Sequence, residues 1–298
     1  MQAMSGSRYA QLIVGVAAIS GAAVLVRLAA APPLAVAAFR LLLAVVILVP
    51  ICLCRARAEL CTLVQREWRW LIAGGTLLAA HFALWIASLS YTSVTSSVVL
   101  VTSTPLFVAL ISRVLFRERI KRATFAGVAI SLAGAIVIGY SGLSRGGATA
   151  SGNLLALSAA LAVAGYLLVG RHLRPGVGLL AYSTAVFSVA GAVLLIAVLV
   201  SGTSLTGYSM RTYCALLALA LLPQLVGHMS LNWALKFLPA TMVTVAVLGE
   251  PVGASFLAWV VLSESPGAHE LAGGILMLSG IAVAFVFGGA SNRVRPAA

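Results

Sequence analysis

The second half of this chain repeats the pattern of the first half at a constant offset of 146 residues. The match is clearest between residues 88–134 and residues 234–280, where a proline, a glutamate and two glycines recur. The matched pairs are Pro105 with Pro251, Glu118 with Glu264, Gly127 with Gly273, Gly134 with Gly280, and Tyr91 with Phe237. A chain that carries one pattern twice is expected to fold as two similar halves.

Long apolar stretches make up almost all of both halves. Of the 298 residues, 62% are hydrophobic and only 8% are charged, and a helix needs about 20 apolar residues to cross a bilayer. We therefore predict an all-α integral membrane protein in which ten helices form one membrane domain over residues 1–298, with repeats at 9–141 and 152–288. The predicted spans are 9–30, 34–54, 68–90, 94–115, 121–141, 152–171, 177–200, 211–235, 240–262 and 269–288.

The cations that give this chain its formal net charge of +13 are distributed unevenly between the two predicted sides of the membrane. If the N-terminus is cytoplasmic, most of the 19 Lys and Arg residues fall in cytoplasmic segments, as the positive-inside rule requires. These are Arg8, Arg55, Arg57, Arg66, Arg69, Arg113, Arg117, Arg119, Lys121, Arg122, Arg171, Arg174, Lys236, Arg293 and Arg295. The charge therefore indicates membrane topology, and we expect no nucleic-acid partner.

The two repeats are predicted to be inverted relative to each other. Because five spans are an odd number, the second repeat must enter the membrane from the opposite face. The predicted cytoplasmic segment 117–122 reads Arg-Glu-Arg-Ile-Lys-Arg, whereas its partner 263–268 reads Ser-Glu-Ser-Pro-Gly-Ala. The glutamate is kept and every cation is lost, which indicates a loop on the outer face.

Glu250 is the only carboxylate well inside a predicted span. It precedes Pro251, whose missing N–H and bulky ring weaken the helix at that point. Two interpretations remain open: a site for a proton or a substrate ammonium group, and a structural acceptor for freed backbone or a neighbouring helix. Its repeat partner is Thr104, so any role of charge is confined to one half.

Two pairs of polar or aromatic residues lie four positions apart in related spans, so each pair shares one helix face. They are His81 with Trp85, and His228 with Asn232. With Tyr166 and Glu250, these residues are predicted to line a central cavity and contact the substrate, with packing as the alternative. Arg27 and Arg40 lie at or within spans, and we expect both to snorkel or to contact backbone carbonyls.

Several of these segments resemble a known repeat. The matching residues are Ser88-Leu89-Ser90-Tyr91-Thr92-Ser93, Pro105, Leu115-Phe116-Arg117-Glu118-Arg119, Gly127 and Gly134, together with Ala234-Leu235-Lys236-Phe237-Leu238-Pro239, Pro251, Glu264, Gly273 and Gly280, and Ala38-Phe39-Arg40-Leu41-Leu42-Leu43-Ala44. They resemble the EamA repeat of the drug/metabolite transporter superfamily, and overall the chain is most similar to bacterial aromatic amino-acid exporters. The resemblance implies ten helices in two inverted halves around a central cavity, and substrates such as amino acids and other metabolites. We expect a bacterial plasma (inner) membrane, and the distribution of cations predicts that both termini are cytoplasmic.

The expected function is export of small metabolites, most of all aromatic amino acids, by alternating access. No Gly-x-x-x-x-Gly-Lys-[Ser/Thr] motif is present, so ATP hydrolysis is not expected to drive transport. A sugar-phosphate, nucleotide-sugar or multidrug carrier, with or without proton coupling, is the alternative. We expect no enzyme activity, cofactor or metal. The expected partners are the small-molecule substrate and the lipid bilayer, and the expected assembly is a monomer or a weak homodimer.

Overall fold

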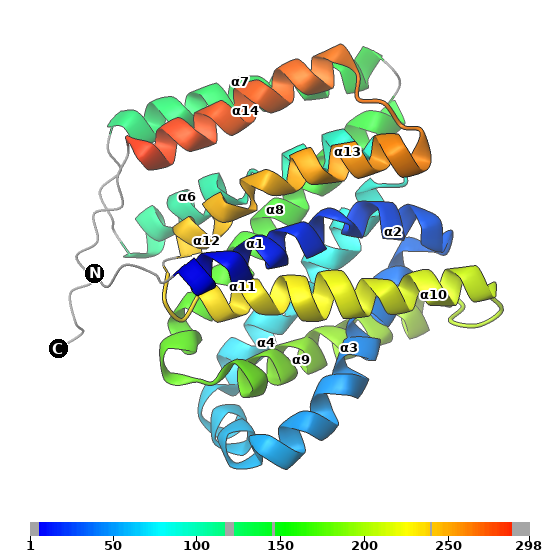
Figure 1. Cartoon of the computed structure of the whole chain (residues 1–298), viewed down its shortest axis with the longest axis vertical. Coiled ribbons are helices and arrows are strands. Elements are labelled where there is room, and N and C mark those ends of the chain that lie inside the picture. Colours follow the sequence, from blue (N-terminus) through cyan, green and yellow to red (C-terminus); the bar gives the residue numbers. More distant parts are fainter. Residues whose placement is uncertain (1–5, 117–121, 145–146, 239, 288–298) are drawn as a thin grey trace.

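The computed structural model of this protein describes residues 6–116, 122–144, 147–238 and 240–287, and helices are the regular structure in these ranges (Figure 1). Glu118 lies outside the described residues, as do Arg117, Arg119 and Lys121. The helices are α1 (Gly6–Ser20), α2 (Ala22–Ala29), α3 (Pro33–Arg55), α4 (Arg57–Ser88), α5 (Val94–Val101), α6 (Thr104–Phe116), α7 (Arg122–Ser144), α8 (Gly147–Leu173), η1 (Arg174–Gly176), α9 (Leu179–Ser201), α10 (Met210–Leu219), η2 (Ala220–His228), α11 (Met229–Ala234), α12 (Ala240–Ala246), η3 (Val247–Gly249), α13 (Glu250–Leu262) and α14 (Ala268–Val286).

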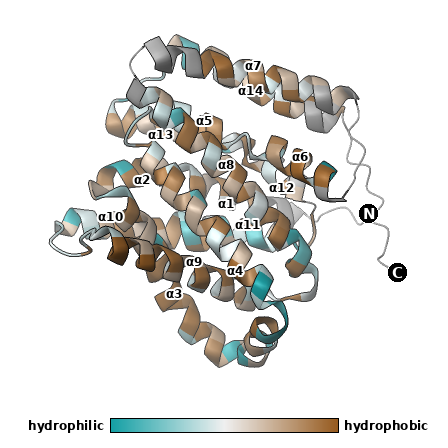
Figure 2. Cartoon of the chain, turned by 180° about the vertical axis from the view of Figure 1, so that it is seen from behind, coloured by the Kyte–Doolittle hydropathy of each residue, from teal (hydrophilic) through white to brown (hydrophobic). Residues whose placement is uncertain are grey.

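Seven helical stretches of the described chain are long and apolar enough to cross a membrane. They are Gln11–Ala29, Pro33–Arg55, Arg57–Ser88, Val94–Val114, Thr149–Gly176, Leu179–Ser201 and Met210–Ala234. Three shorter apolar helices cover Ala126–Ile138, Val247–Leu262 and Ala268–Val283. Hydrophobic residues dominate the helices in Figure 2, and hydrophilic ones appear mainly near helix ends such as those of α10 and α4. These apolar helices confirm the prediction of an all-helical membrane protein.

Prolines interrupt two related spans at equivalent positions. The helix that ends as α5 resumes as α6 at Thr104, and Pro105 is the second residue of α6. In the other half, α12 is followed by the short helix η3, and α13 begins at Glu250 with Pro251 next. Proline is tolerated in the first turn of a helix because the N–H that it lacks has no intrahelical partner there. Thr104 and Glu250 are therefore the first residues of the helices that follow the two interruptions.

The two equivalent helices α7 and α14 pack side by side in opposite directions (Figure 1). Gly280 lies against Ser131, whereas Gly273 lies against Ile138, so the numbering rises along one helix as it falls along the other. Ser131 Oγ donates a hydrogen bond of 3.0 Å to the backbone oxygen of Met277, its partner 146 residues later. Equivalent helices that meet in opposite directions are what a two-fold axis in the membrane plane would produce.

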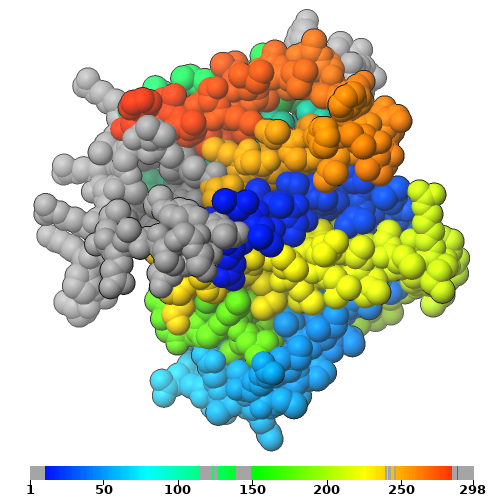
Figure 3. All heavy atoms as spheres, in the orientation of Figure 1, coloured from blue at the N-terminus to red at the C-terminus, as the bar shows by residue number. Residues whose placement is uncertain are grey.

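Helices of the two halves are interleaved. The first-half helices α1 and α2 pack against α10, η2 and α13 of the second half, and Figure 3 shows them between α10 and α13. On the other side of the molecule, α4 of the first half packs against α8 and α9 of the second. The space at the centre is therefore enclosed by both halves.

Candidate functional site

A cavity of about 70 Å³ lies between the two halves of the protein. Apolar side chains form most of its wall, and the helix starts at Thr104 and Glu250 both reach it. The lining residues are Ile19, Ala22, Arg40, His81, Phe82, Trp85, Val101, Thr102, Thr104, Pro105, Val163, Tyr166, Leu167, His228, Leu231, Thr244, Val247 and Glu250. The structure thus brings five of the six sequence-predicted site residues to one cavity, with Asn232 as the exception.

The two histidines from related helices meet at the cavity wall. The ring centroids of His81 and His228 lie 6.3 Å apart, and the ring of Phe82 packs edge-on against His228 at 5.1 Å. Nδ1 of His81 lies 3.0 Å from the backbone oxygen of Ala159. Because a carbonyl oxygen can only accept, this contact assigns the hydrogen to Nδ1 and leaves Nε2 as an acceptor.

Trp85 forms an aromatic wall of the cavity with its helix neighbour His81. The two rings are nearly parallel, at 4°, and their centroids are 6.4 Å apart. Only 3% of the Trp85 surface is exposed, yet its indole Nε1 has no hydrogen-bond partner among the described residues. Indole is a donor only, so an acceptor from outside the protein would satisfy this group.

Tyr166 is held in place by Asn232, which lies behind it. The Tyr166 hydroxyl donates to Oδ1 of Asn232, and Nδ2 of Asn232 donates to Oγ of Ser183 at 3.2 Å. The backbone oxygen of Asn232 accepts from Nε of Arg174 at 2.8 Å. Asn232 is fully buried and is not among the residues that line the cavity. Its hydrogen bonds give it a positioning role for Tyr166.

Arg40 does not snorkel, and that expectation from the sequence is wrong. Only 1% of its surface is exposed, and its side chain lines the cavity. Its Nε donates a hydrogen bond of 2.8 Å to Oε1 of Gln224, and its Cζ lies 4.1 Å from the centroid of the Phe82 ring. The signal that could have placed it was the coexistence of one interior cation with one interior carboxylate, Glu250.

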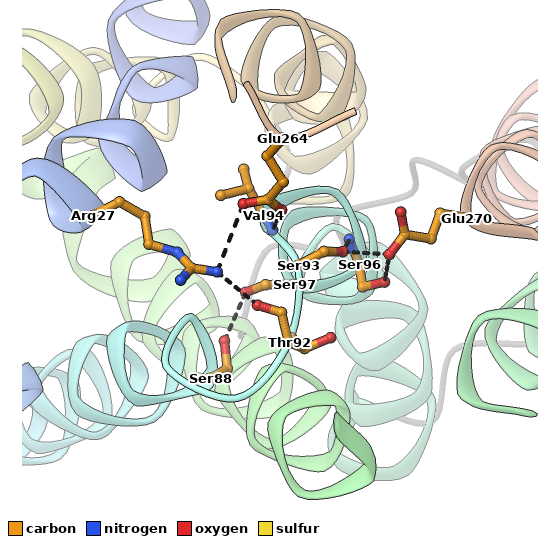
Figure 4. A network of polar contacts seen from close by, with 9 residues as sticks. All are labelled: Arg27, Ser88, Thr92, Ser93, Val94, Ser96, Ser97, Glu264 and Glu270. Carbon is orange, nitrogen blue, oxygen red and sulfur yellow. Dashed lines mark hydrogen bonds and ion pairs between the residues drawn. The ribbon is translucent and has the colours of Figure 1, made fainter. Parts of the chain in front are cut away.

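A second polar network joins the two halves at one end of the molecule (Figure 4). Nη2 of Arg27 donates to the backbone oxygen of Thr92 at 3.0 Å and lies 3.7 Å from Oε2 of Glu264. Oε1 of Glu264 accepts from the backbone N–H of Val94 at 2.6 Å. The expected carbonyl contact of Arg27 is therefore present, and the ion pair with Glu264 was not predicted.

Glu270 completes this network from the start of α14. Its Oε1 accepts from the hydroxyls of Ser93 and Ser96, the latter at 2.8 Å, and its Oε2 accepts from the N–H of Gly267. Ser93 also caps α5 by accepting from the N–H of Ser96 at 3.0 Å. Two carboxylates of the second half are thus bound to the start of α5, where unpaired N–H groups favour negative charge.

A protein-family model matches both halves of the chain. The model of the EamA-like transporter family matches residues 7–140 and 150–286, one copy in each half. The chain belongs to the EamA-like transporter family. It is therefore a multi-pass membrane protein of the drug/metabolite transporter superfamily, a group of transporters.

Solved structures share this fold. In total, 25 chains of solved structures match this protein. One of them, described only as "Crystal structure of protein", has a TM-score of 0.71 and 18% sequence identity, and the match covers 96% of this chain and 100% of that chain. At this identity the match shows a common fold. No curated protein matches the chain.

Proposed function

We propose that this EamA-family protein exports amino acids, aromatic ones above all, by alternating access and without ATP hydrolysis. The observation that carries the proposal is the composition of the central cavity. Aromatic rings of Phe82, Trp85 and Tyr166 line it together with one cation, Arg40, and one carboxylate, Glu250. Ring faces offer a stacking surface for an aromatic side chain and an attractive surface for an ammonium group.

The charge of the cavity favours a zwitterion over a polyanion. Arg40 and Glu250 both line the cavity, and their formal charges cancel. An α-amino acid carries one positive and one negative group and would enter without adding net charge. A nucleotide sugar or sugar phosphate carries two or more negative charges, and burying charges that lack partners is costly. This comparison supports amino acids over sugar phosphates and nucleotide sugars.

The size of the cavity supports a mechanism with a conformational change. Ligand pockets for small molecules measure roughly 300–1,000 Å³. The cavity here is about 70 Å³ and is therefore too small for an aromatic amino acid. We therefore infer that the interleaved halves rock apart on one side to admit the substrate.

We also propose that the three shorter apolar helices cross the membrane, which gives ten spans in two inverted halves. Both termini would be cytoplasmic, in a bacterial plasma membrane. In support, Oε1 of Glu59 accepts from the N–H of Gly178 at 2.5 Å, which joins the arginine-rich start of α4 to the segment between η1 and α9. The cation-poor loop with Glu264 contacts Arg27 and Val94 at the end shown in Figure 4.

Counterflow in liposomes tests the proposed function. Purified protein in liposomes preloaded with phenylalanine should take up labelled phenylalanine transiently, without ATP and without a pH gradient. Unlabelled tyrosine and tryptophan outside should compete, and nucleotide sugars should not. Counterflow of a nucleotide sugar, with none of any amino acid, would identify the protein as a carrier of the alternative class.

A further inference from the structure

We propose that Arg40 and Trp85 form a subsite for the carboxylate of the transported molecule, with Gln224 as the residue that positions Arg40. This inference rests on the proposed function, because it assumes that the cargo passes through the central cavity. It goes further by assigning the recognition of one chemical group to two named N–H donors. It also makes carboxylic acids, with or without an amino group, the ligand class of the cavity.

Two buried donors at the cavity lack acceptors. Within the described residues, Nη1 of Arg40 and Nε1 of Trp85 are both buried without a hydrogen-bond partner. Nearly all buried polar groups in proteins are hydrogen-bonded, and an unpaired cationic donor is especially unfavourable. Both side chains line the same cavity, and Cζ of Arg40 lies 5.8 Å from the Trp85 ring centroid. Two neighbouring groups that can only donate therefore call for an acceptor that the cavity receives from outside.

The guanidinium of Arg40 is fixed in orientation. Its Nε is bound by Gln224 at 2.8 Å, and one face of the group packs over the ring of Phe82 at 4.1 Å. These contacts leave Nη1 for a ligand. A guanidinium is a planar fork of donors that suits a carboxylate, and a pre-oriented fork loses little freedom on binding. This pre-oriented guanidinium is better explained as a contact for an anion than as a side chain that only fills space.

The helix around Gln224 has an irregular geometry. Gln224 and His228 lie in η2, a stretch of π-helix that contains Pro223. Such i→i+5 stretches are rare and are frequently found at functional sites. The repeat partner of Gln224 is Leu78, which lies in the regular helix α4, and the partner of Arg40 is Val186. Both equivalent positions hold apolar residues, so the repeat does not provide a second copy of the contact between Arg40 and Gln224.

Glu250 places the opposite charge on the same cavity. It lines the wall together with Arg40. A carboxylate held by Arg40 would leave an ammonium group free to interact with Glu250. The pair therefore fits both charged groups of an α-amino acid, and the subsite at Arg40 can be tested separately by changing the ligand.

The test uses three probes that differ only in their charged groups: phenylalanine, phenylethylamine without the carboxylate, and 3-phenylpropionate without the ammonium. Binding is measured as the rise in unfolding temperature of the detergent-purified full chain. For wild type, 3-phenylpropionate and phenylalanine should act at concentrations at least ten-fold lower than phenylethylamine. Equal potency of phenylethylamine and 3-phenylpropionate would overturn the subsite.

The variant Gln224→Glu sharpens the test because it preserves the acceptor of Arg40 and adds a fixed carboxylate beside it. It should weaken binding of 3-phenylpropionate at least ten-fold and reverse the preference toward phenylethylamine. Gln65→Glu, at an exposed position of α4, is the matched control and should keep the wild-type preference. An unchanged preference in Gln224→Glu would contradict the positioning role.

Trp85→Phe provides a second variant that keeps an aromatic ring and removes only the indole N–H. It should weaken binding of 3-phenylpropionate about three- to ten-fold with little change for phenylethylamine. An equal loss for both probes would assign Trp85 to ring packing and remove it from the carboxylate site.

The outcomes separate this inference from the proposed function. If wild type prefers carboxylates in the binding assay but shows no counterflow of amino acids, the subsite stands and the proposed cargo is wrong. If phenylalanine counterflow is observed but carboxylates have no advantage in binding, the proposed function stands and the subsite is wrong.

Discussion

Trp85 is the side chain whose removal should affect transport most directly. Its ring lies parallel to His81 and is almost fully buried at the cavity. Losing a stacking surface of this kind removes on the order of 1 kcal/mol or more of ligand binding. Trp85→Ala should therefore lower the rate of phenylalanine counterflow about ten-fold at limiting substrate. Trp68→Ala, at a site 51% exposed, is the matched control. Wild-type kinetics in Trp85→Ala would exclude aromatic stacking from the mechanism.

Glu250 is expected to bind substrate more than to carry an obligatory proton. It lines the cavity as its only carboxylate among the described residues, and its repeat partner Thr104 cannot titrate. Glu250→Gln retains the shape and hydrogen-bonding capacity of the side chain. It should retain measurable counterflow in liposomes without a pH gradient, with a raised KM. If a pH gradient drives uphill accumulation in wild type, and Glu250→Gln abolishes only that accumulation, Glu250 is the coupling residue instead.

The sequence was informative for residues whose position follows from helical periodicity. His81 and Trp85 were placed at the cavity because they share one helix face, and because a similar pair lies in the related span of the other half. Arg40 was misplaced because a cation near the end of a span usually reaches the interface. Its true partner, Gln224, is 184 positions away, and no local pattern links the two. Asn232 shows the same limit, since its partner is Tyr166 on another helix.

At the scale of helices, the packing of two glycines in α14 predicts how alanine at each position changes the stability of the protein. A Cβ on Gly273 would lie 2.8 Å from the backbone oxygen of Gly134, whereas a Cβ on the adjacent Gly274 would meet only Val99, at 3.5 Å. Gly273→Ala should push α14 away from α7 and cost about 1–3 kcal/mol, as overpacking does. Gly274→Ala should be neutral or slightly stabilising, because alanine favours the helix. Unfolding temperatures of both variants in detergent test this, and equal values would contradict the close packing.

Helix interruptions set the other limit on what the sequence could predict at this scale. The sequence predicted a weakened helix at Pro251, where α13 begins, because a proline affects its own helix wherever it lies. Pro223 lies inside the predicted span 211–235, but the sequence did not predict that the helix around it would become a π-helix. That outcome depends on packing against α1 and α3, which only the tertiary structure defines. The contacts of Glu264 with α2 and α5 are likewise tertiary.

For the whole molecule, the proposed orientation predicts which loops face outward. Ser265 lies in the cation-poor loop after α13, and Thr62 lies near the arginine-rich start of α4; both are exposed. In a background without the four native cysteines, Ser265→Cys should react with a membrane-impermeant thiol reagent in intact cells. Thr62→Cys should react only after permeabilisation. Labelling in the reverse pattern would invert the proposed topology, and labelling of both in intact cells would contradict the separation of these loops by the bilayer.

The central claim is that one cavity opens alternately to the two sides of the membrane and carries the substrate. Thr104 lines that cavity and is nearly buried, so it reports access directly. Thr104→Cys, in the cysteine-free background, should react slowly with an impermeant thiol reagent in right-side-out and in inside-out vesicles alike. Phenylalanine should slow the reaction from both sides. Labelling from one side only, or a rate that phenylalanine does not change, would contradict alternating access through this site.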